Sequence, residues 1–274
     1  MECYGLRQIP ERADWRIHAT FSPRPRLERA TIVAPMPESL VTSPSDHLAF
    51  ALDVPTLGEA EAWIGRLGDG VGVYKVGLEL FAAAGRGAID TIHAAGARCF
   101  LDLKLHDIAA TMGRTATVIA DLGVSYFTIH AAAGPEALET VARAVEGTGS
   151  MPLAVTVLTS LDASALEAVG MQGGPEEAVV RLARLAHGSG VRGLVCSPRE
   201  CVALREALGD EPTLVVPGIR PAGAALGDQK RVSSPGQAIR DGADLLVVGR
   251  PIRDAAEPRM AADAIVTEIA EALR

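Results

Sequence analysis

The sequence lacks several features that define large classes of protein. Basic residues are not in excess, since 26 Lys and Arg against 34 Asp and Glu give a formal net charge of −8. This balance argues against a nucleic-acid-binding protein that relies on a broad basic face. No uninterrupted apolar run approaches the ~18 residues that span a bilayer. Because 48% of the 274 residues are hydrophobic, the chain can still bury a full core, so we expect a folded protein bound to neither nucleic acid nor membrane.

Cysteine is scarce and shows no paired spacing. The four cysteines form no C-x-x-C motif, and Cys99 and Cys196 lie inside apolar runs. This pattern indicates buried free thiols in a reducing compartment rather than a zinc site or a disulfide framework. Residues 1–46 contain no apolar region of the secretory kind, because charged residues interrupt each short apolar run. A cytoplasmic location is therefore expected.

Motifs for metals and nucleotide cofactors are also absent from the sequence. There is no G-x-G-x-x-G after a predicted strand and no G-x-x-x-x-G-K-[ST] segment. No H-x-E-H motif or Cys/His cluster accompanies the histidines. His106 and His130, near predicted strand ends, are therefore expected to form hydrogen bonds around a site rather than to bind a metal. We expect neither a metal nor an organic cofactor.

The first 46 residues differ in texture from the rest of the chain. They contain six prolines, scattered arginines and no sustained period of 2 or 3.6 residues, which is typical of a disordered extension. Two explanations stay open. Translation could begin at Met36, or the extension belongs to the protein, with or without a role for its segment around Trp15 in interaction or targeting.

From residue 47 to residue 274, short apolar runs alternate with longer amphipathic segments. Runs that are nearly continuous in Val, Leu, Ile and Phe are typical of parallel strands buried on both faces. The eight predicted strands are 48–53, 71–77, 98–104, 124–130, 153–160, 191–197, 213–219 and 243–249. Helical spacing of Ala, Leu, Glu and Arg predicts helices that include 56–67, 79–95, 111–122, 134–146, 164–188 and 256–273. The alternation predicts a single-domain (β/α)8 TIM barrel of the α/β class, with a doubly wound open sheet as the weaker alternative.

Charged residues collect at the ends of two predicted strands, where the chemistry of such barrels takes place. The third strand runs into D-L-K-L-H-D over residues 102–107. Alternation along a strand sends Asp102, Lys104 and His106 to one face. Since buried charges persist only when paired, an alternating array of cations and anions is expected from Lys75, Asp102, Lys104 and Asp107. The alternative is an ion-pair network that only plugs the barrel, and the position of the array favours function.

The last two predicted strands end in segments suited to a phosphate group. Gly218 and Gly249 permit close approach of the backbone, and Arg220 and Arg250 supply guanidinium groups for a phosphate monoester dianion. Each arginine alone would be interpreted as a solvated surface residue. Both together occupy the positions where phosphate binds in such barrels, which favours a binding role.

Nine segments, in order along the chain, resemble the orotidine 5′-phosphate decarboxylase family in its bacterial type. They are A-L-D (51–53), K-V-G-L-E-L-F (75–81), F-L-D-L-K-L-H-D-I (100–108), H-A-A-A-G (130–134), V-T-V-L-T-S (155–160), G-L-V-C-S (193–197), P-G-I-R (217–220), D-Q-K-R-V (228–232) and V-V-G-R (247–250). D-x-K-x-x-D alone marks a wider superfamily, but nine ordered segments make the resemblance specific. It implies conversion of orotidine 5′-phosphate to UMP and carbon dioxide in pyrimidine biosynthesis, without a cofactor.

The resemblance also implies roles for individual residues. Lys104 is expected to donate a proton to C6 of the pyrimidine, and Asp102 to lie beside the substrate carboxylate and orient Lys104. Lys75 is expected to pair with Asp102 and to contact the ribose. Asp107 is expected to reach the active site of the other subunit, which implies a homodimer with shared sites. The other substrate contacts implied are Asp53, Ile108, Thr111, Thr159, Ser160, Arg220, Gln229, Gly249 and Arg250.

One departure and two alternatives accompany this resemblance. The family usually has Pro where this chain has Ala109, and this change is expected to soften the loop after the third strand. A magnesium-dependent decarboxylase or aldolase of the same superfamily, acting on a phosphorylated keto-sugar, would need an acidic ligand at Lys75, where a cation repels the metal. A non-catalytic nucleotide-binding barrel would bind UMP without turnover.

Overall fold

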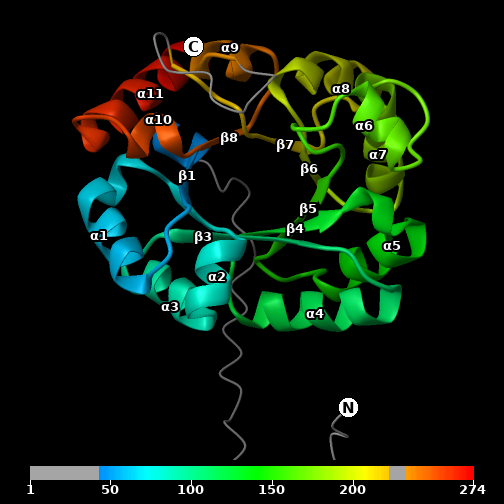
Figure 1. Cartoon of the computed structure of the whole chain (residues 1–274), viewed down its shortest axis with the longest axis horizontal. Coiled ribbons are helices and arrows are strands. Elements are labelled where there is room, and N and C mark those ends of the chain that lie inside the picture. Colours follow the sequence, from blue (N-terminus) through cyan, green and yellow to red (C-terminus); the bar gives the residue numbers. More distant parts are fainter. Residues whose placement is uncertain (1–42, 222–232) are drawn as a thin grey trace, which may run out of the picture. The chain divides into compact units, whose positions relative to one another are not determined.

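Eight parallel strands form a closed barrel in sequence order, with β1 paired to β8 (Figure 1). The computed structural model describes residues 43–221 and 233–274. The strands are β1 (Leu48–Leu52), β2 (Val73–Val76), β3 (Arg98–Leu105), β4 (Tyr126–His130), β5 (Met151–Val155), β6 (Gly193–Val195), β7 (Thr213–Val216) and β8 (Leu245–Val248). The predicted (β/α)8 barrel is confirmed, and each strand lies within or overlaps its predicted apolar run.

Helices surround the barrel and cover its outer face (Figure 1). The α-helices are α1 (Leu57–Leu67), α2 (Leu78–Ala84), α3 (Arg86–Ala94), α4 (Ala109–Asp121), α5 (Pro135–Ala144), α6 (Ala163–Ala168), α7 (Pro175–Gly188), α8 (Cys201–Leu208), α9 (Pro235–Arg240), α10 (Arg250–Arg253) and α11 (Pro258–Ala272). Short 3₁₀ helices are η1 (Pro44–His47), η2 (Gly68–Gly70), η3 (Ala131–Ala133) and η4 (Pro198–Glu200). Among the described residues no helix has the length and apolar character needed to cross a membrane.

Two predicted helices are each divided into two. The segment 79–95 forms α2 and α3, because Gly85 between them has φ +54°, a left-handed conformation that ends the first helix. The segment 164–188 forms α6 and α7, separated by residues 169–174, where Gly170 and Gly173 both have positive φ. Glycine therefore permits both breaks, although the apolar pattern continues across them.

The barrel interior is built in layers of side chains that alternate along the strands. The lower layer contains one residue from seven strands, namely Ala49, Val73, Phe100, Tyr126, Leu153, Val215 and Leu245. Side chains two positions further along each strand face the interior again. Those from β2, β3 and β4 are Lys75, Asp102 and Thr128, whereas those from β5 and β8 are Val155 and Val247. An apolar floor thus lies below a layer that is polar on one side only.

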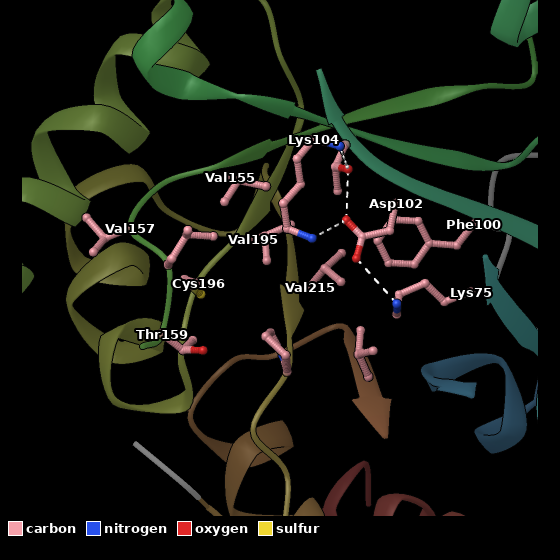
Figure 2. A pocket seen from close by; sticks show the side chains of 14 residues that line it. Lys75, Phe100, Asp102, Lys104, Val155, Val157, Thr159, Val195, Cys196 and Val215 are labelled. Carbon is pink, nitrogen blue, oxygen red and sulfur yellow. Dashed lines mark hydrogen bonds and ion pairs between the residues drawn. The ribbon is translucent and has the colours of Figure 1, made fainter. Parts of the chain in front are cut away.

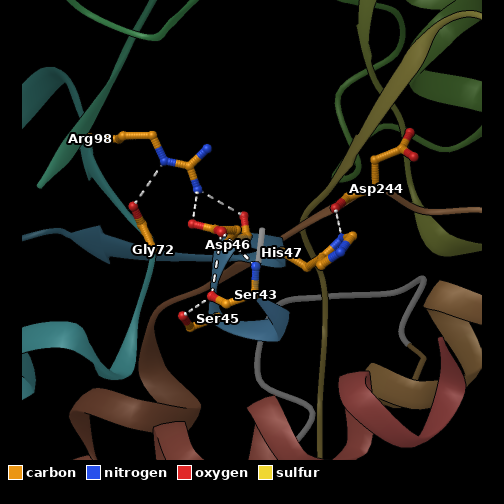
Figure 3. Close-up of polar contacts among 7 residues, drawn as sticks. All are labelled: Ser43, Ser45, Asp46, His47, Gly72, Arg98 and Asp244. Atoms are coloured by element: carbon orange, nitrogen blue, oxygen red, sulfur yellow. Dashed lines mark hydrogen bonds and ion pairs between the residues drawn. The ribbon is translucent and has the colours of Figure 1, made fainter. Parts of the chain in front are cut away.

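Residues 43–47 pack against the end of the barrel at which the strands begin (Figure 3). Asp46 Oδ1 lies 2.7 Å from Nη2 of Arg98, which starts β3, and Arg98 Nε donates to the carbonyl oxygen of Gly72 at 3.3 Å. His47 Nδ1 lies 2.7 Å from the carbonyl oxygen of Asp244. Residues 43–46, which the sequence assigns to the extension, therefore make contacts with the barrel.

Candidate active site

A cavity of about 190 Å³ opens where the carboxyl ends of the strands meet (Figure 2). Its lining residues are Lys75, Phe100, Asp102, Lys104, Thr128, Val155, Val157, Leu158, Thr159, Val195, Cys196, Val215, Pro217 and Val247. The charged groups come from β2 and β3, and the wall from β5 to β8 is almost entirely apolar. A ligand bound in this cavity would therefore meet charged groups on one side and an apolar surface on the other.

The charged side chains form a chain of alternating sign centred on Asp102. Its Oδ1 lies 2.8 Å from Nζ of Lys104, and its Oδ2 lies 3.4 Å from Nζ of Lys75 (Figure 2). Lys75 Nζ is also 3.3 Å from Oδ1 of Asp53, which follows β1. Two ammonium groups thus share one carboxylate. Lys104, at the end of this array of alternating charges, lines the cavity.

The environment of Asp102 favours the carboxylate over the acid. Its side chain is 13% exposed, and burial alone would raise its pKa. The positive charges of Lys75 and Lys104, with hydrogen bonds from Lys104 and Thr128, outweigh burial and hold the pKa of Asp102 below its ordinary value of 3.8. Asp102 is therefore a fixed negative charge at neutral pH.

Lys104 is held by an irregularity in β3. Its φ is +54°, and among the described residues no other residue except glycine has a positive φ. The pairing with β4 also shifts here, because Leu101 pairs with Phe127 and Leu105 with Ile129. Asp102 and Lys104 both line the cavity, as the sequence predicts, whereas His106 is exposed and outside the lining. The strand between Asp102 and Lys104 is not a regular pleat, because a bulge interrupts it.

Thr128 is a cavity residue that sequence reasoning missed. It lies in β4 with 1% exposure, its Oγ1 accepts the Lys104 N–H at 2.8 Å, and it donates to Asp102 Oδ1 at 2.9 Å. The sequence does hold a signal for it. Thr128 lies two residues beyond Tyr126, whose side chain lies in the interior layer, and residues two apart in a strand face the same side. Phe100 and the valines of the apolar wall could have been found from the same two-residue step.

Comparison with known proteins identifies the family. The sequence profile described as "Orotidine 5'-phosphate decarboxylase / HUMPS family" matches residues 46–265. The chain belongs to this family. It is 54% identical over 222 residues to a protein named orotidine 5′-phosphate decarboxylase from Anaeromyxobacter sp. (strain K), covering 81% of this chain and 97% of the relative. A protein of that name from Rhodopseudomonas palustris (strain ATCC BAA-98 / CGA009) is 50% identical over 230 residues, covering 83% and 95%.

A solved structure agrees with this assignment. The crystal structure of orotidine 5′-phosphate decarboxylase from Lactobacillus acidophilus matches with a TM-score of 0.73 and 35% sequence identity, covering 82% of this chain and 99% of that chain. Comparisons of sequence and of fold thus both place the chain in the orotidine 5′-phosphate decarboxylase family.

Asp107 and its neighbours lie outside the array of alternating charges. Asp107 is exposed, and its Oδ1 accepts the N–H of Ile108 at 2.7 Å. Ile108, the N-cap of α4, is 71% exposed, and Thr111 lies half-buried in the first turn of that helix. Within one chain the alternating array is Asp53, Lys75, Asp102 and Lys104, so Asp53 rather than Asp107 provides its second carboxylate.

The remaining residues implied by the family resemblance occupy the other strand ends. Thr159 lines the cavity, whereas Ser160 beside it is exposed and outside the lining. Arg220 follows β7 and Arg250 begins α10 after Gly249, at the ends of two strands that pair with each other. The backbone N–H of Arg220 donates to the carbonyl oxygen of Ser233 at 2.9 Å. Gln229 lies outside the described residues.

Two histidines lie next to the array of alternating charges, and their rings contact each other. The ring centroids of His106 and His130 are 5.3 Å apart with the planes tilted by 36°. Burial, followed by the charges of His106 and Lys104, lowers the pKa of His130 below its ordinary value. Among the described residues, no three His, Cys, Asp or Glu side chains form a group that could hold a metal ion.

Proposed function

We propose that the protein decarboxylates orotidine 5′-phosphate to UMP and carbon dioxide, with Lys104 as the proton donor and without a metal or organic cofactor. The observation that carries this proposal is the Lys104–Asp102–Lys75 chain at the mouth of the barrel, with Nζ–Oδ distances of 2.8 and 3.4 Å. It occurs in a member of the family whose relatives at 54% and 50% identity are named for this activity.

The chemistry requires stabilisation of negative charge at C6 of the pyrimidine as carbon dioxide leaves. No electron sink is available in the ring at that position, so a fixed ammonium directed at the developing charge is the main available device. Lys104, held by Asp102 at 2.8 Å, supplies this ammonium and then its proton. Asp102 beside the substrate carboxylate adds repulsion that departure of carbon dioxide relieves.

The rest of the nucleotide would be held at the other strand ends. Asp53 and Lys75, whose side chains are 3.3 Å apart, suit the ribose hydroxyls. Thr159 and Ser160, after β5, suit the edge of the pyrimidine. The phosphate would be bound by Arg220, Gly249 and Arg250, with Gln229. Binding of the phosphate, away from the reacting carbon, can supply energy that orders the reacting groups.

We also propose a homodimer with shared active sites. Asp107 is exposed beside Ile108, whose apolar side chain is 71% exposed, and Leu78 and Val118 on α2 and α4 are 61% and 59% exposed. A second subunit that covers these side chains would bring its own Asp107 to the neighbouring cavity. Exposed apolar side chains that gather in a patch mark surfaces of this kind.

The chain organisation and location belong to the same proposal. Residues 47–274 are proposed as the decarboxylase barrel, and residues 43–46, which contact it through Asp46 and Arg98, pack with it. Cys99, Cys196 and Cys201 are free and buried, which suits a protein of the reducing cytoplasm.

An assay with orotidine 5′-phosphate in the presence and absence of a chelator tests this function. Conversion to UMP that is unchanged by EDTA supports it. A strict requirement for magnesium would instead favour a keto-sugar-phosphate enzyme, although Lys75 puts an ammonium within 3.4 Å of the carboxylates of Asp53 and Asp102 and would repel the metal. Tight UMP binding without turnover would identify a binding protein.

A further inference from the structure

Lys104 has a backbone conformation that its own residue type does not favour. A left-handed φ of +54° places Cβ close to the carbonyl oxygen and is strained in a residue other than glycine. Such a conformation persists only when its surroundings hold it. The question is which group holds Lys104, because its ammonium is the one directed at the reacting carbon in the proposed function.

The strand register identifies a single residue opposite this part of β3. Leu101 pairs with Phe127 and Leu105 with Ile129, so three residues of β3 face one residue of β4, which is Thr128. The bulge removes the Lys104 N–H from the regular ladder, and the Thr128 hydroxyl oxygen accepts it at 2.8 Å. A partly buried N–H that loses this acceptor is left without a protein partner, which is unfavourable.

The same hydroxyl is bonded to the partner of the Lys104 ammonium. Thr128 donates to Oδ1 of Asp102 at 2.9 Å, and this oxygen also accepts the Lys104 ammonium at 2.8 Å. One side chain thus connects the backbone of Lys104 to the carboxylate that orients the Lys104 side chain. Because the donor of the hydroxyl is committed to Asp102, Thr128 acts through these two residues rather than on the substrate.

We propose that Thr128 is a positioning residue for decarboxylation: its buried hydroxyl locks the β3 bulge and aligns the Lys104 ammonium with Asp102. This inference rests on the proposed function. It predicts that the hydroxyl, and not the volume of the side chain, determines the turnover number. Thr128→Val keeps the shape and strand preference of the side chain and removes the hydroxyl, whereas Thr128→Ser keeps the hydroxyl.

Thr156 provides a matched control. It is buried in the same barrel, at 2% exposure, and its hydroxyl donates to the carbonyl oxygen of Val195 at 2.9 Å. Thr156→Val therefore removes one buried hydroxyl and one hydrogen bond without touching Asp102 or Lys104. Thr128→Val should lower kcat about 10- to 100-fold with little change in KM. Thr128→Ser should restore most of the rate, and Thr156→Val should leave it within about threefold of the wild type.

A second readout does not depend on activity. Lysine occurs only three times in the sequence, at positions 75, 104 and 230, so protein labelled with ¹⁵N-lysine gives three backbone amide signals. The amide signal that is absent from the spectrum of Lys104→Ala is the signal of Lys104. In Thr128→Val this amide should exchange with solvent at least about tenfold faster, since its acceptor is gone, whereas the Lys75 amide should be unchanged. Thr156→Val should alter neither.

Equal loss of kcat in Thr128→Val and Thr156→Val, or unchanged exchange of the Lys104 amide in Thr128→Val, would overturn the positioning role. If the wild-type protein shows no turnover, the proposed function fails, and the amide measurement still decides whether Thr128 holds the bulge. If Thr128→Val does not fold, Thr128→Ser and Thr128→Ala carry the comparison: serine must preserve the slow exchange of Lys104 and alanine must lose it.

Discussion

Asp102 has the most constrained electrostatic environment in the site. It is bonded to an ammonium on each oxygen, at 2.8 Å and 3.4 Å, and to the Thr128 hydroxyl. Its pKa is held below 3.8 against the effect of burial. Removing its charge leaves the Lys104 ammonium without its carboxylate, although Lys75 keeps Asp53 at 3.3 Å. Breaking one partner of a desolvated pair costs more than the pair itself contributes.

Asp102→Asn should therefore lower the free energy of unfolding at pH 7 by about 2 kcal/mol, as measured by urea unfolding. A carboxyl whose folded pKa is depressed contributes stability that is present above its unfolded pKa and lost as pH falls through the folded value. The difference in the free energy of unfolding between the wild type and Asp102→Asn should thus be constant above about pH 5 and should shrink below about pH 4. A difference that stays constant or grows in acid would contradict this assignment.

At the residue scale, the sequence identified the charged groups but not how they are held. Lys75, Asp102 and Lys104 stand out because charges at strand ends of a barrel are costly unless paired. The positive φ of Lys104 could not be predicted, because lysine has no preference for it and the bulge depends on pairing with a strand more than 20 residues away. Thr128 was obscured for a similar reason, since threonine is common in strands without any such role.

At the element scale, the strands were predictable and the helix breaks were not. Each buried parallel strand is a continuous apolar run, and this signal is local. The breaks at Gly85 and at residues 169–174 are backbone events that glycine permits but does not require. The contacts of residues 43–46 with the barrel likewise depend on Arg98, which is distant in sequence.

Gly72 tests the packing of the short η1 segment beneath the barrel. A Cβ at this position would come within 2.6 Å of Cα of Asp46 and of the carbonyl oxygen of Ser45, both backbone atoms. Gly72→Ala should therefore lower the free energy of unfolding by about 1–3 kcal/mol, because backbone has to shift. Thermal unfolding measures this effect.

The control is Gly65→Ala in helix α1, where a Cβ meets nothing within 4 Å. Alanine is preferred over glycine in an exposed helix, so this variant should be more stable by roughly 0.5–1 kcal/mol. If both variants shift the melting temperature in the same direction, the packing of residues 43–46 against Gly72 does not explain the effect of Gly72→Ala.

At the scale of the whole molecule, the net charge of −8 conceals a cationic site. Lys75 and Lys104 lie in the cavity, and Arg220 and Arg250 follow β7 and β8 at the same end of the barrel. Average charge therefore excludes a broad basic surface but not an anionic nucleotide as ligand. The barrel, the end that carries the site and most of its charged residues could be predicted from sequence, whereas the homodimer that the family resemblance implies stays a prediction.

The proposed sharing of active sites between two subunits makes a specific prediction for mixed dimers. Lys104→Ala and Asp107→Ala should each be inactive alone. In a hybrid dimer one cavity receives the intact Lys104 of one subunit and the intact Asp107 of the other. Equal mixtures, exchanged through mild denaturant, should recover about a quarter of wild-type activity if subunits pair at random. If mass spectrometry verifies that hybrids have formed and no activity is recovered, Asp107 does not act in the neighbouring active site.

Turnover of orotidine 5′-phosphate by Lys104→Ala, measured beside the wild type together with UMP affinity, tests the central claim most directly. Loss of a positioned general acid costs about 10²–10⁴-fold in rate, and loss of the ammonium that stabilises the carbanion adds to it. The account predicts a fall in kcat of at least about 10³-fold, with UMP still bound. Turnover equal to that of the wild type would contradict it.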